Sequence, residues 1–154
     1  WPSLTLMLQT IDGGKTWKGF TASLLGKMTR IRMGPGGKGL ALMEFDESFD
    51  YPAEVYLMEP GKTQISRVYR DKRHAVTDVA LAVDGSIYLA GVQTVGAVRL
   101  PLPGKVQILR SNDGKTWLAD PADYRATANR VVLASSPDGH MLAATDTGMI
   151  LRLE

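Results

Sequence analysis

Two aspartates could do chemistry, because two carboxylates that face each other across a cleft can serve as the acid and the base of a hydrolase. Asp46 begins the acidic segment "DESFDYP", residues 46–52, and Asp78 lies in the apolar stretch "VTDVALAV". The segment 46–52 also suits a solvated acidic surface loop, which is the simpler interpretation, or a weak Ca²⁺ site. Asp46 and Asp78 together form the catalytic hypothesis.

Positive side chains gather in a second segment, "RVYRDKRHAV", residues 67–76. Such a cluster can form a rim that binds an acidic protein, a phosphate or a carboxylate, although a solvated charged loop has the same composition. A further set of charged residues lies in the first strands of the predicted repeating units, where they could line a binding face or form salt bridges between the units: Arg30, Arg32, Asp78 and Arg130. The rim hypothesis comprises Arg67, Arg70, Lys72, Arg73, His74, Arg30 and Arg130.

The composition narrows the possible functions. The chain has 154 residues, is 44% hydrophobic and carries a net charge of only +2, so its bulk charge does not predict a nucleic-acid partner. It has no cysteine, which excludes disulfides and thiol chemistry. His74 and His140 are separated and have no cysteine to complete a zinc site. We expect no metal and no cofactor, and no apolar run reaches the length of a membrane-spanning helix.

Three turn segments repeat along the chain. "LMLQTIDGGKTWKGF", "VYLMEPGKTQISRVY" and "VQILRSNDGKTWLAD" each predict a strand, a tight Gly-Lys-Thr turn and a second strand. Their lysines, Lys15, Lys62 and Lys115, lie 47 and then 53 residues apart. A second series of hairpins, with Gly-rich turns near residues 36, 85 and 139, falls between them at nearly the same spacing. The repeating unit therefore contains two hairpins.

A unit of two hairpins predicts a four-stranded antiparallel sheet, whose strands we call A to D. One such sheet cannot bury both faces, and radial stacking of several sheets around an axis covers those faces and leaves only short edges. The sequence thus predicts an all-β fold, a β-propeller of four-stranded antiparallel blades, with helices nearly absent. The glycine-rich "GPGGKG", residues 34–39, is predicted as a hairpin turn between two strands rather than a phosphate loop.

The predicted strands make residues 1–154 part of a single propeller domain. Residues 1–20 hold strands C and D of a first blade, residues 27–69 and 75–119 form two whole blades, and residues 127–154 hold strands A to C of a last blade. These strands amount to about three blades, fewer than the four of the smallest propellers. We expect the C-terminal part of a six- to eight-bladed ring, completed by the remaining blades of the same parent or by a second copy.

The segment "TIDGGKTW", Thr10 to Trp17, matches the Asp-box pattern S/T-x-D-x-G-x-T-W at every specified position. In the shorter copy "SNDGKTW", residues 111–117, either Asp113 (with a gap) or Asn112 (without one) takes the Asp position, and the middle copy keeps only "GKT". On these motifs the chain resembles the Asp-box (BNR, sialidase-like) propellers. Its pattern is most similar to photosystem-assembly-factor-like BNR repeat proteins, which are scaffolds.

The motif residues suit a turn. A short Asp side chain accepts hydrogen bonds from the amides of a tight turn, Gly permits positive φ, and Thr or Ser adds a second local bond. The two tryptophans are expected to begin strand D and to fold back over their hairpins. We therefore predict a structural role for Thr10, Asp12, Gly14, Thr16, Trp17, Ser111, Asp113, Gly114, Thr116 and Trp117.

The resemblance also implies chemistry that the sequence only partly carries. Sialidases bind the sialic acid carboxylate with three arginines, use a Tyr nucleophile with a Glu and an Asp acid, and contain an F/Y-R-I-P segment. Here "TRIRM", residues 29–33, keeps only the Arg-Ile, and no Tyr and Glu can be assigned as a pair. A xyloglucanase-like inverting hydrolase would need two aspartates across a cleft, and Asp46 and Asp78 are formally available.

These observations favour a non-catalytic propeller scaffold that binds another protein through its loop face, formed by the B-to-C and D-to-A connections. A sialidase-like or xyloglucanase-like glycoside hydrolase is the alternative. We expect a protein partner, no nucleic acid and no membrane span. The family resemblance favours a periplasmic or extracellular location.

Overall fold

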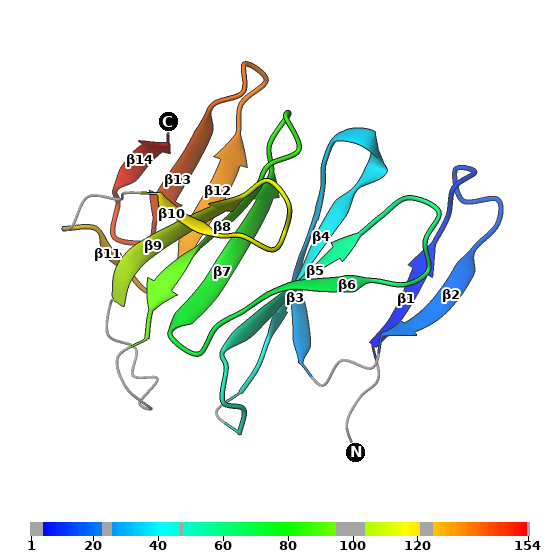
Figure 1. The fold of residues 1–154 in the computed structure, drawn as a ribbon, viewed down its shortest axis with the longest axis horizontal. Helices are drawn as coiled ribbons and strands as arrows, with labels where there is room; N and C mark the ends of the chain where they lie inside the picture. Colours follow the sequence, from blue (N-terminus) through cyan, green and yellow to red (C-terminus); the bar gives the residue numbers. More distant parts are fainter. Residues whose placement is uncertain (1–4, 23–25, 47, 95–103, 121–124, 154) are drawn as a thin grey trace.

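The structure is a computed structural model that describes residues 5–22, 26–46, 48–94, 104–120 and 125–153. In these ranges the chain forms four antiparallel sheets, which follow one another across the molecule in chain order (Figure 1). The only helix of the described ranges is the 3-10 turn η1 (Pro35–Gly37), and none is long and apolar enough to cross a membrane. The prediction of an all-β chain is confirmed.

The sheets, numbered 1 to 4, are built from strands that pair with their neighbours in sequence. Sheet 1 is the hairpin of β1 (Thr5–Gln9) and β2 (Lys18–Ala22), and sheet 4 has the order β12-β13-β14. Sheets 2 and 3 each join two consecutive hairpins, in the orders β3-β4-β5-β6 and β7-β8-β9-β10. The remaining bounds are β3 (Lys27–Met33), β4 (Gly39–Glu44), β5 (Ala53–Met58), β6 (Ser66–Arg70), β7 (His74–Leu81), β8 (Ile87–Gln93), β9 (Gly104–Ser111), β10 (Leu118–Asp120), β12 (Val131–Ser135), β13 (Met141–Thr145) and β14 (Ile150–Leu153).

The short strand β11 (Thr127–Ala128) departs from the predicted organisation. The sequence predicted that residues 127–154 hold strands A to C of a last blade, but Thr127 pairs with Lys105 of β9 and Ala128 pairs with Gly104. β11 therefore belongs to sheet 3, and the first strand of sheet 4 begins at Val131. A two-residue strand is too short to show an alternating pattern, so its partner cannot be read from the sequence.

Sheet stacking buries the apolar side chains. Side chains of a strand alternate between its two faces, and we call the face toward the preceding sheet the N-side face and the opposite one the C-side face. The C-side face of sheet 2 packs on the N-side face of sheet 3, and sheets 3 and 4 meet in the same way. Met7 of β1 packs on the N-side face of sheet 2. The core between sheets 2 and 3 contains Leu40, Leu42, Val55, Val79, Leu81, Ile87, Leu89 and Leu109.

A buried carboxylate joins the first strands of sheets 2, 3 and 4. Asp78 of β7 is fully buried, and its carboxylate lies 3.2 Å from Nη2 of Arg32 in β3. The same carboxylate accepts a hydrogen bond of 2.9 Å from the backbone amide of Leu133 in β12. Arg30 lies 4.0 Å from it, as the salt-bridge alternative for these arginines predicted. One side chain thus connects three consecutive sheets.

The neighbouring threonine adds a second link to sheet 4. Thr77 Oγ1 donates to the carbonyl of Val131 at 2.7 Å and accepts from the amide of Val131 at 3.0 Å. A β-bulge between Val76 and Asp78 interrupts the alternation of β7. Because a bulge re-aims side chains, two adjacent polar residues of β7 can both reach β12.

The two motif tryptophans lie in different surroundings. Trp17 Nε1 donates to the carbonyl of Gly14 in its own turn at 3.0 Å, and the side chain is 58% exposed. Trp117 instead donates to the carbonyl of Val68 in β6 at 3.2 Å, and its ring meets Tyr69 edge-on with centroids 5.1 Å apart. The predicted fold-back over the hairpin is wrong for Trp117, which closes the contact between sheets 2 and 3.

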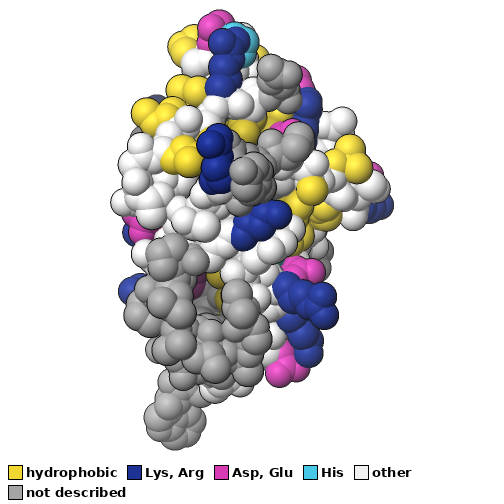
Figure 2. All heavy atoms as spheres, turned by 90° about the vertical axis from the view of Figure 1, so that its left-hand side faces the viewer, with side chains coloured by type: hydrophobic (Ala, Val, Ile, Leu, Met, Phe, Trp, Pro, Cys, Tyr) yellow, Lys and Arg dark blue, Asp and Glu magenta, His cyan; other side chains and the backbone are white. Residues whose placement is uncertain are grey.

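Two faces at the ends of the row of sheets have no described sheet packed against them. On the N-side face of sheet 1, Leu6 and Leu8 are 65% and 60% exposed. On the C-side face of sheet 4, Ile150 is 74% exposed and Val132 is 42% exposed. Figure 2 views the molecule from the side of sheet 4 and shows hydrophobic side chains at the surface among Lys and Arg side chains.

We predict that Asp78→Ala lowers the free energy of unfolding by about 3–5 kcal/mol, because it leaves the amide of Leu133 unpaired and Arg32 without its counter-ion. Chemical denaturation monitored by tryptophan fluorescence measures this loss. Asp50→Ala is the matched control, since Asp50 pairs with Lys72 in solvent and should leave the midpoint nearly unchanged. Equal midpoints for the two variants would contradict the joining role of Asp78.

The tryptophans provide a second, internally controlled prediction. Trp117→Ala should cost roughly 2–3 kcal/mol, because it removes a ring packed between two sheets. Trp17→Ala occupies the same motif position and should cost less than about 1 kcal/mol, since its ring is mostly in solvent. Thermal melts of both variants test the difference, and a larger loss for Trp17→Ala would reverse the assignment.

Candidate functional site

Three aromatic rings meet at one end of the sheets. The β4–β5 loop and the β6–β7 connection lie at this end, which we call the loop end, opposite the β3–β4, β7–β8 and β12–β13 turns (Figure 1). The ring centroids of Phe45 and Phe49 are 4.9 Å apart, and those of Phe45 and Tyr51 are 5.0 Å apart in an edge-on arrangement. All three rings are half-buried. Phe45, Phe49 and Tyr51 form the aromatic cluster.

Arg70, at the end of β6, links the aromatic cluster to a buried carboxylate. Its guanidinium lies 4.0 Å from the centroid of the Tyr51 ring, within the range of a cation–π contact. The same guanidinium pairs with Glu54 of β5, which is only 2% exposed. Arg67 lies 3.2 Å from Glu54, and the Tyr56 hydroxyl donates to it at 2.6 Å. Burial and the adjacent Glu54 raise the pKa of Tyr56, which keeps the phenol protonated as a donor.

The strand geometry explains how one carboxylate reaches two arginines. Arg67 and Arg70 are three residues apart, so a regular strand would place them on opposite faces. β5 and β6 pair with Glu54 opposite Arg70 and Tyr56 opposite Arg67, and the register shifts between Val55 and Tyr56. This irregularity brings both arginines to the side of Glu54.

Sequence reasoning missed five residues of this site. Phe49 and Tyr51 stand in the segment 46–52 but were not candidates themselves. Phe45, Glu54 and Tyr56 were not candidates either, although Glu54 gives a local signal as a charged residue inside the apolar run "PAEVYLM". A carboxylate that must be buried in such a strand needs a counter-ion, which points to the basic segment that follows. Phe45 carries no such signal, because an aromatic at a strand end is equally suited to the core.

The predicted basic rim is divided in the structure. Arg67 and Arg70 pair with Glu54, and Lys72 pairs with Asp50 at 2.9 Å. Arg30 lies beside Asp78. Arg73 and Arg130 are exposed, on the β6–β7 connection and just before β12. The structure therefore gathers only part of the predicted rim at the aromatic cluster.

His74 lies inside the sheet rather than on a rim. It begins β7, is 1% exposed, and its Nδ1 lies 2.9 Å from the Tyr69 hydroxyl. Burial lowers the pKa of His74 to about 4, and the nearby charge of Asp71 opposes this shift only in part. His74 is therefore neutral at neutral pH and offers no positive charge to a ligand. Its assignment to a binding rim is corrected accordingly.

The two aspartates of the catalytic hypothesis have different surroundings. Asp78 is fully buried between strands, whereas Asp46 is exposed and accepts a hydrogen bond of 2.9 Å from the amide of Ser48 in its own turn. A carboxylate without exposed surface cannot exchange a proton with a substrate, because it cannot reach one. Among the described residues, no group of three His, Asp or Glu side chains could hold a metal ion.

The motif aspartates act as hydrogen-bond acceptors of their turns. Asp113 accepts from the amides of Thr116 and Lys115 at 2.7 and 2.8 Å, and these bonds lower its pKa to about 2. Asp113, not Asn112, therefore takes the Asp position of the second motif. The Thr16 hydroxyl and amide do the same for Asp12, whose pKa also falls to about 2. Both carboxylates are ionised at any physiological pH.

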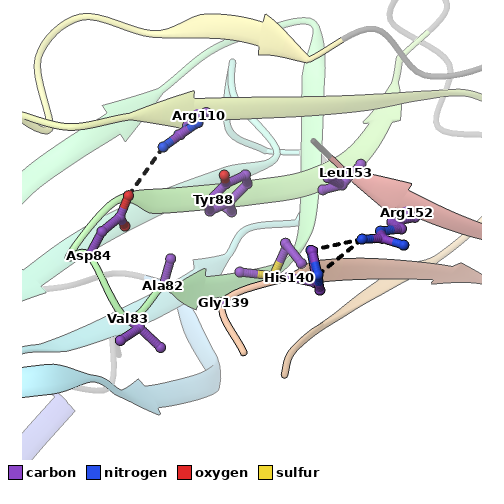
Figure 3. A pocket seen from close by; sticks show the side chains of 10 residues that line it. Ala82, Val83, Asp84, Tyr88, Arg110, Gly139, His140, Arg152 and Leu153 are labelled. Atoms are coloured by element: carbon purple, nitrogen blue, oxygen red, sulfur yellow. Dashed lines mark hydrogen bonds and ion pairs between the residues drawn. The ribbon is translucent and has the colours of Figure 1, made fainter. Parts of the chain in front are cut away.

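A cavity of about 800 Å³ lies between sheets 3 and 4 (Figure 3). It is beside the β7–β8 and β12–β13 turns, at the end of the sheets opposite the loop end (Figure 1). Four of its polar side chains form two pairs. Nη2 of Arg110 lies 3.2 Å from Asp84, and Nη2 of Arg152 lies 3.0 Å from Nε2 of His140. Its apolar lining comes from Val83, Tyr88, Met141 and Leu153. One of these pairs belongs to sheet 3 and the other to sheet 4.

The buried histidine predicts a pH dependence of stability. The folded chain holds the pKa of His74 near 4, below the ordinary 6.5, so between these values the unfolded chain binds a proton that the folded chain does not. Stability should therefore fall by about 3 kcal/mol as the pH drops from 6.5 to 4. Denaturation curves between pH 7.5 and 5 should show this slope in the wild type and in the exposed-site control His140→Gln, but a flatter one in His74→Phe. A slope that survives in His74→Phe would contradict the assignment.

A comparison with protein-family models and with curated proteins finds no match to this chain. The resemblance to Asp-box propellers therefore depends on the motif residues and the turns that they form. The loop-end geometry provides the basis for a functional interpretation.

Proposed function

We propose that this chain is part of a non-catalytic β-propeller scaffold that binds another protein through its loop end. The stacking of sheets in chain order supports the propeller arrangement, since sheets 2 and 3 each pack one face toward the sheet before it and the other toward the sheet after it. The contacts of Asp78 also support the propeller arrangement. They connect the first strands of three sheets, β3, β7 and β12, as expected where first strands line a common axis.

The aromatic cluster with Arg70 is the observation that carries the proposed binding function. Aromatic residues and arginine are enriched where protein interfaces gain most of their binding energy. The cluster is half-buried, so its rings are held in place before a partner arrives. Arg70 is also fixed by Glu54, which reduces the side-chain entropy that binding would cost.

A glycan-active enzyme is the second candidate, because aromatic rings at a protein surface can also stack on sugars. A glycoside hydrolase needs two carboxylates placed on either side of the scissile bond. Near the aromatic cluster, Glu54 is held by two arginines and a tyrosine, and Asp50 pairs with Lys72. These pairings favour the scaffold over the hydrolase.

Affinity capture from an extract of the source cells tests the proposal. Wild type and the surface control Leu118→Ala should retain the same proteins, while Phe49→Ala/Tyr51→Ala should lose at least one of them by about tenfold or more. Thermal melts of all variants must first show that they fold. Hydrolysis of aryl glycosides by the wild type, abolished in Asp46→Asn, would replace the scaffold by the enzyme, and identical protein sets for all variants would also contradict the proposal.

A further inference from the structure

Four of the seven methionines of this chain pack together between sheets 1 and 2. Met43 of β4 is fully buried, and Met7 of β1, Met28 of β3 and Met58 of β5 pack against the buried group that contains it. The strand register places Met28 directly opposite Met43. We call these four residues the methionine cluster. Thioether side chains from three strands of sheet 2 and one strand of sheet 1 thus meet in one place.

The methionine cluster lies against two residues of the loop-end site. Tyr56 belongs to the same buried group as Met43, and Phe45 packs against that group. The Tyr56 hydroxyl donates to Glu54, which is the carboxylate that holds Arg70. Phe45 is one of the three rings of the aromatic cluster. The thioethers therefore support the loop-end site from within the sheets.

The sulfur atoms give this apolar group a reactivity that aliphatic side chains lack. A peroxide transfers one oxygen atom to a thioether: the sulfur gives up two electrons, the O–O bond breaks, and the other oxygen leaves as water. The product is a sulfoxide, which is polar and therefore costly in an apolar contact. The chain has no cysteine, so methionines carry all of its sulfur.

Exposure decides which methionines an oxidant can reach. Met43 is fully buried, whereas Met7, Met28 and Met58 are each partly exposed. A small peroxide can therefore oxidise these three while they remain packed in the methionine cluster. Met33 is 65% exposed and lies outside the cluster, so its sulfoxide would stay in solvent.

We propose that oxidation of Met7, Met28 and Met58 by a peroxide loosens the loop-end site and so places its binding of a partner under redox control. A sulfoxide in the methionine cluster displaces Tyr56 and Phe45 from their packing. Arg70 and the aromatic rings then lose the support that fixes their positions. Reduction of the sulfoxides by methionine sulfoxide reductases reverses the change. The effect on binding rests on the proposed function, whereas the loosening of the site does not.

Amide hydrogen exchange measures the loosening without any partner. After treatment with hydrogen peroxide, the amides of β5 and of the β4–β5 loop should exchange about tenfold or more faster than in the untreated chain. Peptide mass spectrometry should assign sulfoxides to Met7, Met28 and Met58. Methionine sulfoxide reductases A and B with a thiol reductant should then restore the original exchange.

Two sets of variants identify the methionines that matter. Met7→Leu/Met28→Leu/Met58→Leu removes the three reactive sulfurs and conserves volume, so it should fold, and its exchange should change less than about twofold on peroxide treatment. Met33→Leu/Met149→Leu is the matched control. It removes one exposed and one partly buried methionine outside the methionine cluster and should respond as the wild type does.

Affinity capture tests the consequence for binding. Peroxide-treated wild type and the control should lose, by about tenfold or more, the protein that Phe49→Ala/Tyr51→Ala fails to retain. The triple variant should keep it after the same treatment. Unchanged capture by a wild type whose exchange has accelerated would contradict redox control of binding.

Three results would overturn the inference as a whole. The three methionines could resist peroxide in the folded chain, their oxidation could leave the exchange unchanged, or the triple variant could respond as the wild type does. If the triple variant does not fold, the reductases decide the matter in the wild type, because exchange that stays fast after the sulfoxides are reduced contradicts the proposal. The exchange experiment needs no partner, so it can succeed where the proposed binding function fails.

Discussion

The buried charge of Asp78 is the constraint on which the stacking of the sheets depends. A carboxylate with no exposed surface is costly unless charged and polar partners surround it, and here those partners come from two other sheets. The apolar contacts between sheets are nonspecific in direction, since aliphatic side chains can pack in several registers. The ion pair with Arg32 and the bond from Leu133 are directional, so they select the register in which three first strands meet.

The need of a carboxylate for hydrogen-bonding or charged partners also explains the roles of other acidic residues. Asp12 and Asp113 are occupied by turn amides, Asp78 by neighbouring strands and Glu54 by two arginines. Acid-base chemistry needs a carboxylate whose proton can reach a substrate. Of the two aspartates that the sequence offers as catalysts, Asp78 is engaged by neighbouring strands and Asp46 accepts a hydrogen bond from the amide of Ser48 in its own turn. The functional interpretation centres on the aromatic cluster at the loop end, because it places three rings and Arg70 together at a half-buried surface.

The strands and turns could be predicted from the sequence because they depend on local chemistry. Alternation and Gly-Lys-Thr turns identify the strands of sheets 2 and 3, and the motif residues predict the turn bonds of Asp12. The candidate site depends on the register shift between Val55 and Tyr56, and the contacts between sheets depend on a second irregularity; local patterns show neither. A bulge in β7 aims Thr77 and Asp78, and it requires Gly91 opposite, where a Cβ would lie 2.1 Å from the carbonyl oxygen of Ala75. The burial of His74 and the contact of Trp117 with β6 depend on packing between sheets, which the sequence of one segment does not show.

The strands hold the residues of the loop end in place. Loops usually carry function on a scaffold that positions them, and here Arg70 provides one link between the two. Arg70 contacts Tyr51 of the β4–β5 loop and the buried Glu54 of β5 at the same time. Because the Glu54 carboxylate cannot remain buried without its arginines, the guanidinium stays in place and holds the Tyr51 ring, and Tyr51 in turn contacts Phe45 and Phe49. The binding surface is therefore positioned by a buried ion pair in the second sheet rather than by the loop sequence alone.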